Sequence, residues 1–142
     1  MSLLPWLVLT AGIGLPELVH LEVGAYVAPR FDVHARLTAP LLQPALGAGV
    51  RFHAGRIDSG RPPRWSATGA LDVTLNPAHP AVFSRGEQLG FAAYPMIGAQ
   101  HLSDTGFVGR LEVGAILELE DRSGFPRVGG GPGIRLAVGL AF

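Results

Sequence analysis

His101 and Ser103 are separated by one residue and have side chains that could act together in catalysis. A histidine that takes a proton from a nearby serine hydroxyl is the usual arrangement for nucleophilic hydrolysis. Side chains alternate between the two faces of a strand, and counting from Phe91 and Ile97 places both residues on the outward face. They are therefore the candidate catalytic pair. The plainer interpretation, which we prefer, is a polar turn between two strands.

A second group of residues could bind a metal ion. Imidazole and carboxylate groups on neighbouring strands are ligands for zinc or nickel. No helical or loop spacing sets such a geometry here, so we expect hydrogen-bonded members of a polar barrel interior instead. We predict no metal site and no cofactor. The group comprises His20, His34, His53, Glu22 and Asp32.

The composition limits the class of protein. Of 142 residues, 48% are hydrophobic and 15% are charged, with 11 basic against 11 acidic residues and no cysteine. The even charge balance argues against a nucleic-acid partner. No apolar run approaches the ~18–20 residues that a membrane-spanning helix needs. The length fits a single domain, residues 1–142, whose apolar residues are spread over alternate positions.

Apolar residues alternate with polar or small ones through most of the chain, which is the pattern of β-strands. Proline and glycine separate the alternating stretches, and Pro77–Gln88 and Asp121–Pro132 are expected to be loops. Pro95 is unusual within a strand because it lacks a backbone N–H. The predicted strands are Leu7–Gly14, Leu18–Ala28, Phe31–Ala39, Ala45–Gly55, Trp65–Asn76, Leu89–Ala99, Phe107–Glu120 and Gly133–Phe142.

The two faces of the predicted strands differ in charge. One face is apolar and nearly uncharged, whereas charged residues and glycines share the other. An arginine or lysine that faces lipid costs about 2–4 kcal/mol at the membrane midplane, so an uncharged face is typical of lipid exposure. We therefore predict an all-β, antiparallel, up-and-down transmembrane barrel of eight strands. A soluble β-barrel that binds a small apolar ligand is an alternative.

The polar faces of neighbouring strands can be aligned through their turns. A tight turn at Pro29 places Glu22 opposite Arg36, and the next connection places Asp32 near His53. Opposite charges that meet across strands stabilise a sheet. Such pairs would fill a narrow lumen with ion pairs.

The last predicted hairpin adds to this polar lumen. With a loop over Asp121–Pro132, it places Glu118 or Glu120 opposite Arg135. We therefore expect Arg135 to be paired with one of these two carboxylates inside the barrel.

The pattern resembles the small bacterial outer-membrane β-barrels over nearly the whole chain. The last strand, which ends in Phe142, is similar to the strand that the barrel-assembly machinery recognises in that superfamily. The resemblance implies an even strand number, contact with outer-membrane lipid and a location in the outer membrane of Gram-negative bacteria. Residues 1–14 are then either the first strand or a signal-peptide remnant. We prefer the strand because it makes the number even.

The sequence from His101 to Asp104 is also similar to the His-x-Ser-Asn stretch of the outer-membrane lipid A deacylases. That resemblance implies lipid hydrolysis, with Ser103 as the nucleophile and His101 as the base. The chain departs from the family because Asp104 replaces the asparagine, and because Glu112 and Glu118 are predicted to face the lumen. We therefore expect a structural or interaction role through the loops, toward an unidentified extracellular ligand, with lipid hydrolysis as the alternative.

Overall fold

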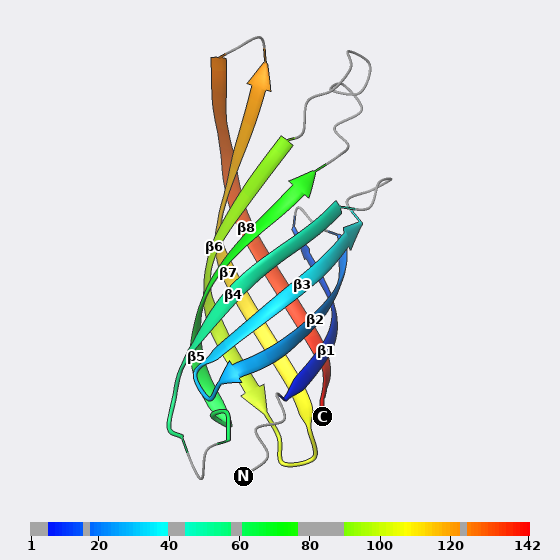
Figure 1. Cartoon of the computed structure of the whole chain (residues 1–142), viewed down its shortest axis with the longest axis vertical. Coiled ribbons are helices and arrows are strands. Elements are labelled where there is room, and N and C mark those ends of the chain that lie inside the picture. Colours follow the sequence, from blue (N-terminus) through cyan, green and yellow to red (C-terminus); the bar gives the residue numbers. More distant parts are fainter. Residues whose placement is uncertain (1–5, 16–17, 40–44, 58–60, 77–89, 123–124) are drawn as a thin grey trace.

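A computed structural model of the chain is a closed barrel of eight antiparallel strands (Figure 1). It describes residues 6–15, 18–39, 45–57, 61–76, 90–122 and 125–142. Each strand pairs with the next along the chain, which confirms the predicted all-β, eight-stranded, up-and-down fold. The strands are β1 (Leu7–Leu15), β2 (Val19–Ala28), β3 (Phe31–Ala39), β4 (Ala45–Ala54), β5 (Trp65–Asn76), β6 (Gly90–Leu102), β7 (Phe107–Arg122) and β8 (Phe125–Ala141).

Strand β1 closes the ring by pairing with β8. The ladder runs from Val8 opposite Ala141 to Leu15 opposite Ile134. The prediction that residues 7–14 form a strand is confirmed. β1 begins and β8 ends at the same end of the barrel, beside the β2–β3 and β6–β7 turns (Figure 1). We call this the turn end, and the opposite one the far end.

The prediction of a loop over Asp121–Pro132 is wrong. β7 continues to Arg122 and β8 starts at Phe125, so the two strands form one long hairpin. Glycine weakens an isolated strand, which is why the run of glycines resembles a loop in sequence. The long alternating β7 supplies partners for these residues, and Gly131 pairs with Ile116. The other predicted loop, Pro77–Gln88, lies outside the described residues.

Strand β6 passes through Pro95 and ends at Leu102, beyond the predicted end at Ala99. Its pairing with β5 is continuous, but its pairing with β7 is interrupted between Ala93 and Met96. Proline has no N–H to donate, so an opening in the ladder accommodates it. The register of β6 against β7 is the same on both sides of this opening.

Apolar side chains cover the outside of the barrel, and polar ones fill its inside. The interior has two small apolar clusters, one toward each end, with charged residues between them. No helix in the described ranges is long and apolar enough to cross a membrane. The cluster toward the far end consists of Ala70, Ala92, Tyr94, Met96 and Ile116, and the cluster at the turn end of Val8, Tyr26, Leu102 and Val108.

Candidate functional site

Charged side chains from six strands meet inside the barrel, and each is at most 4% exposed. They reach the same space because each occupies an inward position in the alternation of its strand. A buried ion without a partner costs several kcal/mol, so the site depends on pairing. The lumen network consists of Glu22, Asp32, Asp72, Glu112, Arg36, Arg51, Arg110 and Arg135.

Glu22 on β2 accepts hydrogen bonds from three arginines. Arg36 Nη2 lies 2.5 Å from Glu22 Oε2, as expected for a residue directly opposite in the ladder. Arg110 Nη1 lies 2.6 Å and Arg51 Nη1 3.1 Å from Oε1. Arg51 and Arg110 belong to β4 and β7, which do not pair with β2. This one carboxylate therefore links strands across the lumen.

Asp72 on β5 is the second junction of the lumen network. Arg36 Nη1 lies 2.5 Å from Asp72 Oδ2, and Arg135 Nη1 donates to the same oxygen. His34 Nε2 lies 2.7 Å from the other oxygen, Oδ1. Because Arg36 contacts both junctions, it connects Asp72 to Glu22.

Asp32 on β3 is the third junction. His53 Nε2 lies 2.6 Å from Asp32 Oδ2, which confirms the predicted proximity of these two residues. His34 Nδ1 lies 2.9 Å and Arg51 Nη1 3.2 Å from Oδ1. Arg51 also donates through Nε to Glu112 Oε1 at 2.7 Å. The network thus extends from β3 to β7.

His34 contacts a carboxylate with each ring nitrogen. An ionised carboxylate only accepts hydrogen bonds, so both nitrogens must donate when Asp32 and Asp72 are ionised. The ring is then an imidazolium that connects β3 to β5. This charge adds to the four arginines that face four carboxylates in the lumen.

The prediction that Glu118 or Glu120 faces Arg135 is wrong. The ladder places Glu112 opposite Arg135, Glu118 opposite Gly129 and Glu120 opposite Arg127. The error follows from the misplaced loop, because a hairpin that turns nearer the far end shifts every pair along it. The side chains of Glu118 and Glu120 lie outside the described residues.

Some members of the lumen network were missed by pairwise alignment of strands. Their signal was present, because all of them fall on the polar face of an alternating stretch. Cross-strand alignment detects only neighbours in a ladder, whereas these residues meet partners across the lumen. The missed residues are Arg51, Asp72 and Arg110; Glu112 was predicted to face the lumen, but its contact with Arg51 was not predicted.

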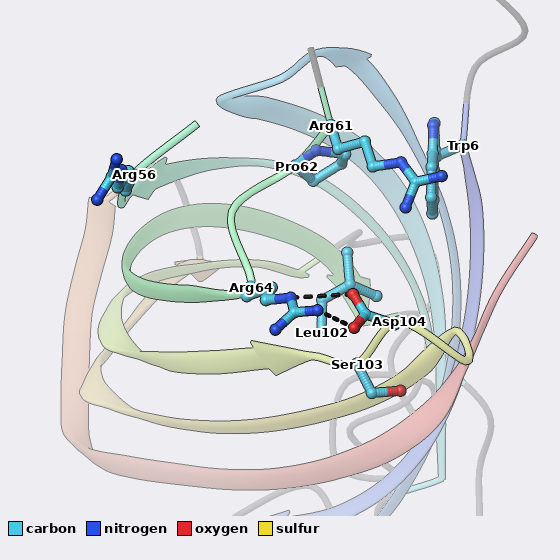
Figure 2. A pocket seen from close by; sticks show the side chains of 8 residues that line it. All are labelled: Trp6, Arg56, Arg61, Pro62, Arg64, Leu102, Ser103 and Asp104. Atoms are coloured by element: carbon cyan, nitrogen blue, oxygen red, sulfur yellow. Dashed lines mark hydrogen bonds and ion pairs between the residues drawn. The ribbon is translucent and has the colours of Figure 1, made fainter. Parts of the chain in front are cut away.

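His101 and Ser103 have separate surroundings. The His101 ring packs against the outward Trp65 ring, with the centroids 4.4 Å apart and the planes tilted by 45°. Ser103 lies beyond the end of β6, in the β6–β7 turn at the mouth of the barrel (Figure 2), so strand alternation does not determine where its side chain points. Its Oγ accepts a hydrogen bond from Phe107 N at 2.9 Å and lies 2.8 Å from the Thr105 hydroxyl. The serine hydroxyl thus stabilises the turn.

The candidate metal ligands are also engaged with different partners. The described residues hold no group of three or more histidine and carboxylate side chains arranged to bind a metal ion. His34 and His53 both hydrogen-bond to Asp32, and Glu22 is surrounded by arginines. His20 is buried, and its Nδ1 has no hydrogen-bond partner within the described part of the chain.

Exposed aromatic side chains gather at the turn end. They start or finish their strands there, and the Phe31 and Phe52 rings lie 5.1 Å apart. The backbone of Phe142 exchanges hydrogen bonds of 2.8 and 3.1 Å with Leu7, so its ring, which is 72% exposed, stands on the outer wall. We call this set the aromatic girdle: Phe31, Phe52, Trp65, Phe107 and Phe142.

The lumen network is a polar plug by its chemistry. Glu22, Asp32 and Asp72 each contact more than one arginine or histidine side chain, which suits a rigid interior and not a site that exchanges substrate. Comparisons with known protein families, curated proteins and solved structures found no match for this chain.

Proposed function

We propose that this chain is an integral outer-membrane β-barrel with a plugged lumen, and that its role is structural or interactive. The distribution of side chains supports this most strongly. Among the side chains that the structure describes, 29 large apolar ones are exposed, whereas no arginine, aspartate or glutamate of a described strand position is. In water, the apolar side chains would be favoured inside the barrel and the charged ones outside. Exposed apolar patches of this extent mark contact with another apolar phase. Lipid favours the arrangement seen here.

Strand length and the aromatic girdle agree with this proposal. A tilted strand needs about 9–11 residues to cross a bilayer, and the strands here have 9 to 17. Aromatic rings concentrate where lipid headgroups meet the hydrocarbon core. The aromatic girdle would therefore mark one membrane surface.

The orientation follows from the connections. Outer-membrane barrels have short turns on the periplasmic side and longer connections outside. The turn end has the two-residue Pro29-Arg30 turn, the turn from Ser103 to Gly106 and the longer β4–β5 connection of residues 55–64, whereas the longest connection, residues 77–89 between β5 and β6, belongs to the far end. We therefore assign the turn end to the periplasm, and the far end, toward which the β7–β8 hairpin extends, to the exterior (Figure 1).

A barrel of eight strands is just wide enough to be filled by side chains. Here the lumen network crosses that space from Glu22 to Arg110 and from Arg51 to Glu112. Ion conduction through the centre would require these contacts to break. A barrier role, or a role in holding the far-end connections at the cell surface, fits this interior better than transport.

The test is to produce the chain with a secretory signal in a Gram-negative host and to separate the membranes. We expect the protein in the outer-membrane fraction, with faster gel migration when unheated than when boiled, because a folded barrel resists detergent. Recovery as a soluble protein whose migration does not change on heating would contradict the proposal. The same gel test after refolding into phosphatidylcholine vesicles separates failure of export from failure to insert.

A further inference from the structure

The β7–β8 hairpin continues past β1 at the far end of the barrel (Figure 1). The β1–β8 ladder stops where Leu15 lies opposite Ile134, whereas β8 begins at Phe125. Residues 125–133 of β8 pair with β7 on one side, and no strand of the described ranges pairs with their other side. We call this other side the free edge. A structural or barrier role does not explain how it is kept from other chains.

A free edge is a hazard for a β-protein. Its unpaired N–H and C=O groups can pair with the edge of another strand, so an unprotected edge promotes association between chains. The free edge of β8 is nine residues long, and its centre is the glycine run Gly129–Gly131, which has no side chains to cover the backbone. Protection of this edge must therefore come from elsewhere in the strand.

The ladders determine which backbone groups of β8 point to the free edge. In an antiparallel strand, the N–H and C=O of one residue point to one neighbouring strand, and those of the next residue point to the other. Phe142 N donates to Leu7 O, toward β1, whereas Ala141 N donates to Gly106 O, beside β7. The registers of β8 with β1 and with β7 both run without a shift. Even-numbered residues of β8 therefore point to β1 or, beyond it, to the free edge.

Four residues point to the free edge, at positions 126, 128, 130 and 132, and two of them are prolines. Pro126 and Pro132 have no N–H, so Val128 and Gly130 supply the only donors of this edge. Neither proline weakens the hairpin, because an N–H at these positions would point away from β7. This is why β8 can keep both prolines in its ladder, opposite Asp121 and Ala115.

A second copy of the chain is a poor partner for such an edge. Two free edges that pair antiparallel about a twofold axis at Gly129 place Pro126 of each copy opposite Pro132 of the other. Neither residue of these two pairs can donate, so both ends of the ladder lack their hydrogen bonds. Moving the axis to Val128 or to Gly130 still leaves a proline within the ladder. The prolines therefore oppose self-pairing in each register.

We propose that Pro126 and Pro132 protect the free edge and prevent the barrel from pairing with a second copy of itself through β8. Proline on an edge strand is one of the means by which β-proteins avoid joining edge to edge. Here the two prolines act at the only positions where they remove an edge donor without removing a bond to β7. The inference concerns the hairpin and does not depend on the membrane location proposed above.

The experiment restores the missing donors. The full chain is folded in dodecyl maltoside with Pro126→Thr and Pro132→Thr combined, and analytical ultracentrifugation measures its mass over a range of protein concentrations. We expect the natural sequence to be monomeric and the double variant to dimerise at least about tenfold more tightly, since the end pairs gain hydrogen bonds. Pro132→Thr alone should have a smaller effect in the same direction, and it provides the test if the double variant does not fold.

Gly131→Thr is the matched control. It also adds a threonine to β8, but the N–H of residue 131 points to β7, and a Cβ there meets no atom within 4 Å. This variant should stay monomeric. Gly129→Cys, added to a chain that has no cysteine, locates the contact, because a disulfide between two copies forms only if the free edges meet.

The heat shift on a gel shows that each variant is folded. A folded variant that stays monomeric after its prolines are replaced overturns the proposal. Equal dimerisation of the Gly131 variant also overturns it, because strand propensity would then explain the effect. Dimers that do not form the Gly129→Cys disulfide would reveal another interface, with the same consequence. A failure in any of these tests leaves insertion into vesicles, and hence the proposed function, unaffected.

Discussion

The Nε2 atom of His34 on β3 lies 2.7 Å from Oδ1 of Asp72 on β5, although β4 separates the two strands. The contact passes over Gly49, which is opposite both residues in its two ladders. A Cβ at Gly49 would lie 2.1 Å from Asp72 Oδ1 and 2.7 Å from His34 Nε2. Because Gly49 has no side chain, the buried side chains of His34 and Asp72 can meet across β4.

Gly49→Ala should separate His34 from Asp72 and destabilise the barrel by about 3 kcal/mol, the scale of breaking a buried charged contact. Urea titration of folding in phosphatidylcholine vesicles measures the change in unfolding free energy. Gly69→Ala is the control, because a Cβ there meets no atom within 4 Å. Equal stability of the two variants would show that the His34–Asp72 contact contributes little.

Glu22→Gln should destabilise the barrel by about 3–5 kcal/mol, because it removes the charge that three buried arginines share. The same urea titration provides the measurement. Asp104→Asn is the matched comparison, since its ion pair with Arg64 is largely exposed, with side-chain exposures of 61% and 66%. An exposed pair contributes at most about 1 kcal/mol. The prediction fails if the two changes have the same effect.

Val113→Arg should impair insertion into membranes, with a cost of about 2–4 kcal/mol if the side chain faces the lipid midplane. Val113 lies on the outer face of β7 and is 43% exposed. Thr105→Arg, which places the same charge in the exposed β6–β7 turn, should insert normally. The yield of heat-modifiable protein in vesicles distinguishes the two. Normal insertion of the Val113 variant would count against lipid contact at this position.

The barrel should not conduct ions in a planar bilayer. Arg51 bridges Glu22, Asp32 and Glu112, and these contacts occupy the lumen between its two apolar clusters. Single-channel recording with the refolded protein is the measurement, and a porin of about 16 strands serves as the conducting control. Stable open channels in the unmodified protein would contradict a plugged lumen.

Expression of the chain should leave the mass of lipid A unchanged. Ser103 Oγ hydrogen-bonds with Phe107 N and Thr105, and the His101 ring packs against Trp65. Ser103→Ala should cost about 1 kcal/mol of stability through the lost hydrogen bond, again without changing the lipid. Mass spectrometry of extracted lipid provides the check. A lipid A that has lost an acyl chain, and that regains it with Ser103→Ala, would establish the hydrolase instead.

Much of the fold follows from periodicity alone. Alternation determines which face each side chain occupies, and the Pro29 turn determines that Glu22 faces Arg36. The local sequence pattern predicted the wrong strand bounds where glycine and proline occur. The glycines before Gly133 resemble a loop, yet they pair with β7, because a long partner strand outweighs their low strand propensity.

The amino-acid sequence by itself determined most of the strands and the separation of an apolar face from a charged one, because both depend on a period of two residues. The strand at Leu7–Gly14 was preferred for the even strand number that the resemblance implies. Only the tertiary structure decided which charges meet. Arg110 reaches Glu22, 88 residues away in sequence, and Arg135 reaches Asp72 although Glu112 is its ladder partner. These contacts cross the lumen, so they exist only once β1 pairs with β8 and closure brings the distant strands around one narrow space.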